Sequence, residues 1–402
     1  MGGIPSVLLP FRIEDRELIY PSPNVERIVQ HVDDFFVAEN LRCQRSQMLS
    51  LGGYHAIIEI TVGRRDDVSV HSSVDENLPI QPGQRRLIAR VDFPFQVCST
   101  NKAIGVPWKL PSEVATMRYL KANTSIPIPN IYFYDEDSDG EVGGPWMLME
   151  YVEGEALPYS WETMNREQKH SICQSIAEYW NQLLSLRFDA LGSLCIDQSG
   201  EITVGPLSMM CSISAGAYDH PSRQKCGPFE TPREWILAMA KGDFRYKTRM
   251  RMVRGSKDPI AEAKARQTQR LSRMETNVTL LSKLPLLYKD SPIHPIALCP
   301  VDFRMHNVIV STEDPTIIVG VIDWEGTQTA PIWNIRRDSF FNLVEPKEQA
   351  EMDAVIWEKV SNLNAEWADA MASGGSLRDA ALRADLSDWE PERYTWEIPD
   401  SG

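Results

Sequence analysis

Four polar side chains lie close together in the stretch CPVDFRMHNVIV, between two aliphatic runs. Asp302 and Asn307 are five residues apart on one predicted loop, and Asp323 ends the next aliphatic run, sixteen residues beyond Asn307. In a hairpin-like arrangement these three side chains would converge at one end. Carboxylate and amide oxygens gathered in this way suit Mg²⁺, and a carboxylate can also accept the proton of a hydroxyl group.

This spacing matches the layout with which protein kinases transfer phosphoryl groups, a D-x-x-x-x-N loop followed by a metal-binding Asp after a strand. In that layout Asp302 is the catalytic base, and Asn307 and Asp323 hold metal on the phosphates of ATP. The pattern alone is a weak signal, because each of the three residues could also cap a turn or bond only its own loop.

The other two polar residues of the stretch have open roles. Arg304 could offset charge on a transferring phosphoryl group, contact an anionic substrate, or be an ordinary surface arginine. We expect His306 to pack or to form hydrogen bonds rather than to catalyse.

The elements that must position this loop divide the chain into two parts. Residues 1–150 predict a β-rich lobe on the nucleotide side, with a helix near residues 25–36 and then the order β-β-β-α-β-β. Its strands are expected in 46–63 (two strands around a Gly-Gly turn), 85–95, 129–137 and 144–154. Residues 151–402 predict a mostly helical lobe on the substrate side.

Two features of the first lobe lie where a kinase binds phosphate. Gly52 and Gly53 form the hairpin tip, where a phosphate-covering loop would lie. Arg90 shares one face of the third strand with Ile88 and Asp92, and kinases place a lysine on that strand.

The helix after this strand and the strand at the lobe junction supply the remaining parts. Ser112 can cap the helix, which places Glu113 in its first turn as the partner of Arg90. That pair is either the phosphate-side ion pair or a purely structural strut. The segment MLMEYVEG, with Glu150 and Val152, would offer backbone groups to adenine.

The second lobe is expected to consist of helices around a few short strands. An apolar stripe at helical spacing, Ile172, Ile176, Trp180 and Leu183, predicts a core-facing helix. The remaining expected segments are helices around 233–237, 258–284 and 347–371, strands within 295–301, 307–311 and 316–323, and an acidic tail from about 374 to 402. A basic stretch at 244–257 is either a solvated face or a site for an anionic substrate group.

Composition excludes several classes of partner. The net charge of −15 argues against a nucleic-acid-binding protein and against an anionic membrane surface. No apolar run approaches the roughly 20 residues of a membrane helix.

Seven cysteines without a C-x-x-C motif indicate a reducing compartment, so we expect a cytoplasmic protein. Gly2 and Ser6 match a loose myristoylation pattern, but no basic cluster supplies a second membrane signal. The sequence carries no indication of oligomeric state.

Several longer segments together resemble one family. They are LGGYHAIIEI, SEVATMRYLKANTSIPIP, WMLMEYVEG, LGSL with DQSGEITVGPL, GPFETPREWI, DFRMHNVIV and GVIDWEG, which span roughly residues 45–345. The chain resembles the aminoglycoside phosphotransferase and choline-kinase-like branch of the protein-kinase-like fold, and most of all its fungal members.

The resemblance implies an α+β, bilobal fold that binds ATP between an N-terminal antiparallel sheet with a helix and a mostly helical C-terminal lobe. It implies Asp302 as catalytic base, Asn307 and Asp323 as Mg²⁺ ligands, and Arg90 with Glu113 as the phosphate-side ion pair. The chain departs from the family where H-G-D usually stands, at Pro300-Val301-Asp302, and at Arg90 in place of lysine.

We therefore expect an ATP- and Mg²⁺-dependent phosphotransferase that acts on a hydroxyl group of a small molecule, in fungal secondary metabolism. Two alternatives stay open. The fold could serve ATP-independent natural-product chemistry such as cyclisation or condensation, or it could be a catalytically silent binding module.

Overall fold

The computed structural model describes most of the chain. The described residues are 22–51, 55–65, 83–92, 108–137, 140–208, 226–232, 234–235, 295–335 and 339–374. Several expectations lie outside them. These are the Gly52–Gly53 turn, most of the segment 233–237, the helix at 258–284, the basic stretch 244–257, the Gly2 and Ser6 pattern, and the tail beyond residue 374.

The first half is built on a five-stranded antiparallel sheet with the spatial order β1-β2-β3-β5-β4. Its strands are β1 (Leu41–Leu51), β2 (His55–Arg64), β3 (Arg85–Asp92), β4 (Ile131–Asp135) and β5 (Trp146–Glu150). With α3 (Lys109–Asn123) between β3 and β4, the chain follows the expected order β-β-β-α-β-β. The hairpin and the third strand predicted from the sequence are thus confirmed.

The two faces of this sheet have different partners because side chains alternate along each strand. Leu87, Ala89 and Val91 of β3 are buried in a small apolar core with Ile28 and Val32 of α2 (Val25–Phe35). The opposite face of β3 carries Ile88, Arg90 and Asp92, as the alternation predicts, and Arg90 reaches Glu113 of α3. The sheet therefore has one apolar face and one that carries buried charge.

Helix α3 begins earlier than its sequence suggests, so the predicted cap is wrong. Its N-cap is Trp108, and no side chain caps it. Pro111 lies in the first turn, where its missing N–H has no intrahelical partner to lose, so the proline does not mark the helix start. Ser112 and Glu113 consequently lie in the second turn, and Lys109 lies one turn before Glu113 on the same side of the helix.

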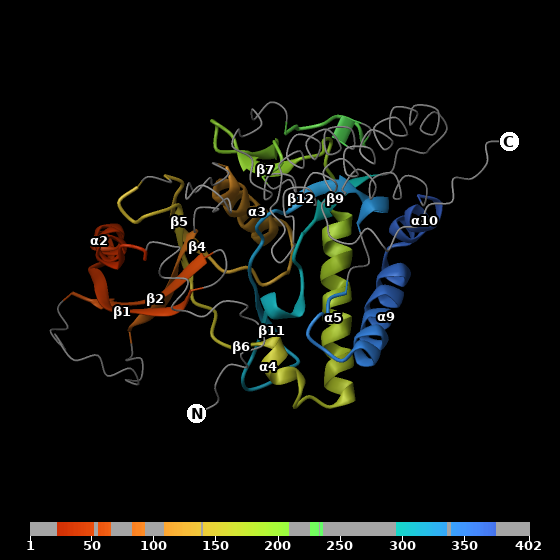
Figure 1. The fold of residues 1–402 in the computed structure, drawn as a ribbon, viewed down its shortest axis with the longest axis horizontal. Helices are drawn as coiled ribbons and strands as arrows, with labels where there is room; N and C mark the ends of the chain where they lie inside the picture. The colour runs from red at the N-terminus through yellow and green to blue at the C-terminus, as the bar shows by residue number, and fades with distance from the viewer. Residues whose placement is uncertain are drawn as a thin grey trace, which may run out of the picture.

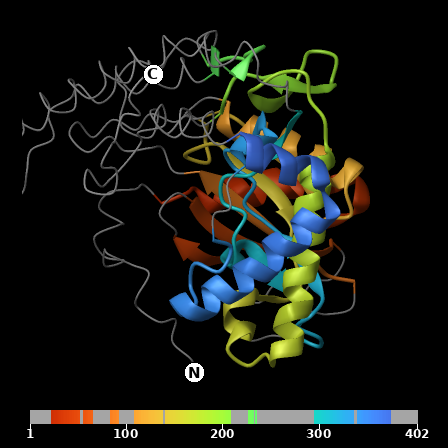
Figure 2. The ribbon, with the colours of Figure 1, turned by 90° about the vertical axis from the view of Figure 1, so that its right-hand side faces the viewer.

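The second half packs around two long neighbouring helices, α5 (Arg166–Ser185) and α9 (Pro346–Leu363). Figure 1 shows them side by side to the right of the sheet, with α3 between sheet and helices, and Figure 2 shows them crossing in front of the sheet. The expected stripe on α5 is buried, as predicted. The single helix expected at 347–371 is instead broken at Asn364, whose side chain accepts the Trp367 N–H at 2.9 Å and so starts α10 (Ala365–Ser373).

Short elements complete the second half. They are β6 (Glu155–Ala156), α4 (Leu157–Trp161), β7 (Ser193–Ile196), β8 (Ile202–Gly205), β9 (Ile296–Cys299), β10 (Val308–Val310), β11 (Ile318–Val321) and β12 (Gln328–Pro331), with 3-10 turns η4 (Met305–Asn307) and η5 (Ile332–Asn334). A further 3-10 turn, η2 (Val37–Glu39), lies in the first half between α2 and β1. The antiparallel hairpin β10–β11 is extended by β6, which ties the lobe junction to this hairpin. The three strands predicted around residues 295–323 are confirmed.

The described residues form an α+β structure with an antiparallel sheet beside a largely helical half, as expected. Its larger core includes apolar residues of α3 as well as those of the helical half, so α3 packs with the second half more than with the sheet core. The division at residue 150 stays a prediction. No helix in the described part of the chain has both the length and the apolar content needed to cross a membrane.

Candidate active site

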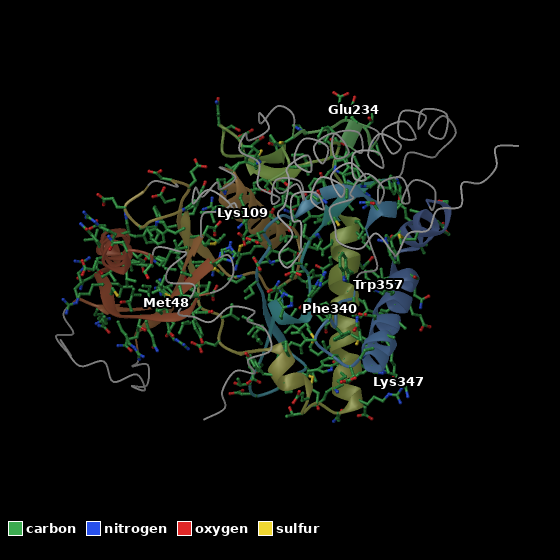
Figure 3. The ribbon with its side chains drawn as sticks, viewed as in Figure 1. Met48, Lys109, Glu234, Phe340, Lys347 and Trp357 are labelled. Atoms are coloured by element: carbon green, nitrogen blue, oxygen red, sulfur yellow. The ribbon has the colours of Figure 1, made fainter. Side chains whose placement is uncertain are left out.

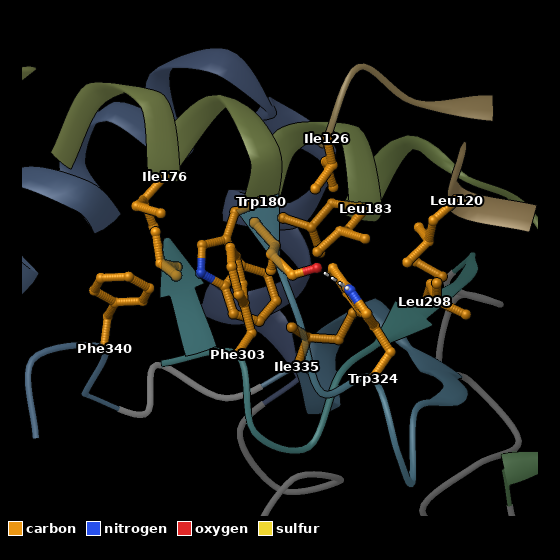
Figure 4. Packing of buried hydrophobic residues seen from close by; sticks show 14 of the residues in the cluster. Leu120, Ile126, Ile176, Trp180, Leu183, Leu298, Phe303, Trp324, Ile335 and Phe340 are labelled. Carbon is orange, nitrogen blue, oxygen red and sulfur yellow. Dashed lines mark hydrogen bonds between the residues drawn. The ribbon is translucent and has the colours of Figure 1, made fainter. Parts of the chain in front are cut away.

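An aromatic cluster fixes the loop that carries the candidate base. Phe303 is buried and its ring lies 5.4 Å from Trp180, 5.9 Å from Trp324 and 5.6 Å from Phe340, measured between centroids. Figure 4 shows this packing. The Met305 N–H also donates to the Phe340 carbonyl at 3.1 Å. Phe303 and Met305 therefore fix the backbone on both sides of Arg304. Asp302, which directly precedes Phe303, can be partly exposed and still have a fixed position.

Asp302 accepts hydrogen bonds from most of its own loop. His306 Nε2 lies 3.0 Å from Asp302 Oδ2, and Arg304 Nε lies 3.1 Å from Oδ1. Asn307 Nδ2 donates to the Asp302 carbonyl at 2.9 Å and more weakly to Oδ2 at 3.3 Å. We call Asp302, Arg304, His306 and Asn307 the loop cluster. The hydrogen bond expected of His306 is confirmed, and its partner is the candidate base.

These contacts set the charges of the loop cluster. The hydrogen bond from His306, with the nearby Arg304 charge, lowers the pKa of Asp302, although partial burial opposes this. The same hydrogen bond raises the pKa of His306, helped by the charge of Asp302 and by Asn342. Asp302 is therefore ionised at neutral pH, and 37% of its side chain is exposed.

The β10–β11 hairpin brings Asn307 and the segment of Asp323 together. Val308 pairs with Val321, and the Ile322 N–H donates to the Asn307 carbonyl at 2.9 Å. Asp323 directly follows Ile322 and has a left-handed φ of 62°. A non-glycine residue pays of the order of 1–2 kcal/mol for that conformation, which is typical of functional sites. The hairpin therefore places the backbone of Asn307 beside the segment that carries Asp323, and the convergence of the three side chains stays a prediction.

Arg90 and Glu113 form a buried ion pair. Arg90 Nη1 donates to Glu113 Oε1 at 2.8 Å, and Nη2 donates to Oε2, so both ends of the guanidinium bind one carboxylate. Arg90 Nη1 also lies 3.4 Å from Asp323 Oδ1. The Arg90 side chain is 7% exposed and that of Glu113 is 0% exposed. Arg90 thus links the predicted helix partner to a predicted metal ligand.

Burial acts on these ionisable groups in opposite directions. It would lower the pKa of Arg90, but the charges of Glu113 and Asp92 raise that pKa, and Arg90 stays charged. Burial raises the pKa of Glu113 to about 7 and holds that of Asp323 above its ordinary value. In both cases the charge of Arg90 opposes burial but does not outweigh it.

Further buried charges lie beside this pair that the sequence reading did not assign to the site. Lys109 Nζ lies 2.6 Å from Glu325 Oε2 and 3.4 Å from Asp92 Oδ2. His55 Nε2 lies 3.0 Å from the same Glu325 oxygen. Figure 3 shows Lys109 at the start of α3, between the sheet and the helical half. We call His55, Arg90, Asp92, Lys109, Glu113, Asp323 and Glu325 the buried charge cluster.

Three of the unassigned residues do carry a signal in the sequence. Asp92 is two residues after Arg90 on the same strand face, and Glu325 is two residues after Asp323. Lys109 is four residues before Glu113, one helical turn, and this becomes visible only when the helix is known to include residue 109.

Glu150 and Val152, at the predicted lobe junction, have different contacts. The Glu150 N–H donates to the Asn130 carbonyl at 2.8 Å, and its carboxylate accepts from the Asn130 amide. Val152 packs against Gly320 of β11 so closely that a Cβ at residue 320 would lie 2.7 Å from a Val152 methyl group. Among the described residues, nothing accepts a hydrogen bond from the Val152 N–H.

The donor chemistry of the site fits Mg²⁺ and a nucleotide. Asn307 uses its Nδ2 on Asp302, which leaves its Oδ1 as an oxygen that could bind Mg²⁺ together with the Asp323 carboxylate. Within the described ranges no three His, Cys, Asp or Glu side chains gather as a metal cluster, so phosphate oxygens and water would complete the shell. The Val152 N–H is a backbone donor of the kind that an adenine acceptor nitrogen requires.

Curated relatives match parts of the chain. Altered inheritance of mitochondria protein 9, mitochondrial, of Meyerozyma guilliermondii is 26% identical over 43% of this chain and 29% of its own length. A subtelomeric hrmA-associated cluster protein of Aspergillus fumigatus is 31% identical over 35% of this chain and 27% of its own length. The matches therefore span less than a third of each relative.

Solved structures resemble the chain more distantly. The streptomycin–ATP complex of the aminoglycoside phosphotransferase APH(2'')-IIa covers 86% of this chain and 85% of its own, at 12% identity and a TM-score of 0.41. The ADP-bound APH(2'')-Ib covers 90% and 97%, at 12% identity and a TM-score of 0.44.

The family comparison covers most of the site. The model of the phosphotransferase enzyme family, APH, matches residues 83–334, which is more than half of the chain. The matched region runs from just before β3 through the loop cluster to Asp323 and Glu325. The resemblance inferred from the sequence is thus confirmed, and the chain belongs to the APH phosphotransferase enzyme family, with its protein-kinase-like fold.

Proposed function

We propose that this protein transfers the terminal phosphoryl group of ATP to a hydroxyl group of a small molecule, with Mg²⁺ as its metal. The observation that carries the proposal is the β10–β11 hairpin, which places the backbone of Asn307, hydrogen-bonded to Asp302, beside the segment that carries Asp323. Membership of a phosphotransferase family supports the reaction type.

In this proposal Asp302 orients the acceptor hydroxyl and takes its proton. As that proton moves to an Asp302 oxygen, the acceptor oxygen bonds to the transferred phosphorus and the bond to ADP breaks. Because phosphoryl transfer passes through a loose transition state, the proton need move only late, and a base with a low pKa suffices. Asp302 then contributes mainly through orientation.

The other site residues would bind Mg²⁺ and the nucleotide and hold the catalytic groups in position. Asn307 and Asp323 would hold Mg²⁺, which neutralises charge on the phosphates when it is bound. Arg90 holds the carboxylate of Asp323 in place from the sheet side, and Arg304 lies close enough to Asp302 to offset charge on the transferred group. The Val152 N–H and the neighbouring junction backbone would bind adenine.

The setting that we propose is fungal secondary metabolism. Its support is limited to the fungal relatives, one of which is named as a cluster protein. The acceptor would be found by screening hydroxyl compounds for ADP release.

Titration with Mg-ATP tests the proposal. Specific binding should stabilise the folded protein by about 2.7 kcal/mol at a nucleotide concentration a hundred times the dissociation constant. Thermal shift and calorimetry measure this directly. No shift at millimolar Mg-ATP would contradict the proposal and favour ATP-independent chemistry. Binding without ADP release across the hydroxyl panel would instead favour a silent kinase-like module.

A further inference from the structure

The side chains of Lys109 and His55, from the first half of the chain, meet on a single oxygen atom of the second half. Lys109 Nζ lies 2.6 Å and His55 Nε2 lies 3.0 Å from Glu325 Oε2. Both also approach the Asp92 carboxylate, Lys109 at 3.4 Å and His55 at 3.3 Å. A carboxylate oxygen within 3.0 Å of both an ammonium nitrogen and an imidazole nitrogen has the surroundings of an oxyanion bound in a small cradle.

The cradle lies where phosphates would be expected. His55 is the first residue of β2. Lys109 lies one turn before Glu113 on α3, and Glu325 lies two residues after Asp323. The side chains of Lys109, His55 and Glu325 are 7%, 13% and 14% exposed, so any anion bound there would be largely shielded from water.

Arg90 is poorly placed to bind phosphate directly. Its two terminal nitrogens are both taken up by Glu113, and one of them also approaches Asp323. Lys109, in contrast, is a compact ammonium on a flexible stem, which can exchange one oxygen partner for another without losing a two-pronged contact. A buried ammonium requires an anionic partner, and Lys109 can keep Asp92 while it exchanges Glu325 for another oxyanion.

We propose that Lys109 and His55 bind a phosphate oxygen of the nucleotide, and that Glu325 occupies their cradle when no nucleotide is bound. This inference rests on the proposed function, since it assumes that the protein binds a nucleotide. It moves the phosphate-binding cation from Arg90 to Lys109. Glu325 becomes a competitor that the phosphate displaces, and Arg90 positions Asp323.

Calorimetric titration with adenosine, AMP, ADP and Mg-ATP separates phosphate binding from adenine binding. In Lys109→Met, we expect ADP and Mg-ATP affinity to fall by about tenfold or more, the typical loss for a hydrogen bond to a charged group. Adenosine affinity should stay unchanged. Lys121→Met is the matched control, because Lys121 lies on the same helix but donates to the Ile128 carbonyl, and it should bind all four ligands normally.

A second variant tests the competition and does not depend on the folding of Lys109→Met. Glu325→Gln keeps the shape of the side chain but removes the competing charge. It should tighten ADP binding several-fold when the titration is done without Mg²⁺, so that any contact of residue 325 with metal is not measured. Lys109→Arg, which keeps a cation, should retain part of the preference for ADP over adenosine.

The outcomes distinguish this inference from the proposed function. Wild-type protein that binds none of the four ligands overturns the proposed function and this inference with it. Wild-type protein that binds ADP, with the preference for ADP over adenosine unchanged in folded Lys109→Met, overturns this inference alone and makes Lys109 a structural strut. Unchanged or weaker ADP binding by Glu325→Gln overturns the role of Glu325 as competitor.

Discussion

The loop cluster and the buried charge cluster meet at the β10–β11 hairpin but are built in opposite ways. All four members of the loop cluster come from residues 302–307, and the Asp302 side chain is 37% exposed. The buried charge cluster draws its seven members from the starts or ends of β2, β3 and α3 and from the segment after β11, and its central pair is almost fully buried. One cluster is open and local, and the other is closed and assembled from distant segments.

This difference sets what each cluster can contribute. Ion pairs that water reaches contribute about 0–1 kcal/mol to folding, so the loop cluster can be tuned for chemistry at little cost in stability. Buried charges pay a large desolvation cost that is offset only while every partner is present. The buried charge cluster should therefore control stability and nucleotide binding, whereas the loop cluster should control the rate of transfer.

The first prediction tests this separation at the loop cluster. Asp302→Asn should lower the rate of ADP release with an acceptor by roughly 10²–10⁴-fold, because it removes the group that orients the hydroxyl and takes its proton. Affinity for Mg-ATP, measured by calorimetry, should be unchanged. A variant that keeps wild-type turnover would show that Asp302 is only a turn residue.

The second prediction tests the buried charge cluster. Glu113→Ala should lower the free energy of unfolding by about 3–5 kcal/mol, because Arg90 loses its two-pronged partner while remaining buried. Urea unfolding followed by circular dichroism measures this. The control is Glu351→Ala, which removes an exposed partner of Arg166 and should cost no more than about 1 kcal/mol. Equal costs for the two substitutions would contradict the contrast between buried and exposed charges.

How far each cluster could be predicted follows from how it is built. Asp302 and Asn307 were predictable because they lie five positions apart on one loop, and β-strand periodicity placed Arg90 and Asp92 on one face. Lys109 was missed because Pro111 and Ser112 suggested a later helix start. Its contact with Glu325 joins residues more than two hundred positions apart, and only the packing of α3 into the larger core brings them together.

The contacts of Asp302 in this chain also differ from what its sequence motif suggests. Where the family usually has H-G-D, this chain has Pro300-Val301-Asp302, so no histidine precedes the candidate base at that position. In the structure Asp302 is braced from the other side by His306, and Phe303 is held in the aromatic core. A spacing motif does not reveal such a replacement, because the new brace follows the Asp instead of preceding it.

The third prediction concerns β11, the strand that connects the lobe junction to the buried charge cluster. Gly320→Ala would place a methyl group 2.7 Å from Val152, a stiff β-branched side chain, so the junction must shift. We expect a loss of about 1–3 kcal/mol in the free energy of unfolding, as for other overpacked sites. Adenosine affinity should fall while the contacts of Asp302 stay intact. Unchanged adenosine affinity in the folded variant would remove the Val152 backbone from the nucleotide site.

The last prediction has the smallest expected effect and uses pH to isolate one contact of the loop cluster. Asp302 has a pKa below its ordinary value of 3.8, and His306 has a pKa above its ordinary value of 6.5. The lowered group stabilises the fold above pH 3.8, and the raised group stabilises it below pH 6.5. Between these values both charges are present, and the pair should contribute about 1 kcal/mol after allowance for its exposure to water.

His306→Gln removes the imidazolium and should therefore lower the melting temperature most between pH 4 and 6.5. The difference from wild type should shrink as the pH rises through the raised pKa of His306, because wild-type His306 then also loses its charge. Ser361→Ala is the control, since it removes only a hydroxyl group that donates to the Trp357 carbonyl, and its effect should be constant from pH 5 to 9. If the His306→Gln difference is just as constant, the contact between His306 and Asp302 is a neutral hydrogen bond and the loop cluster carries no imidazolium.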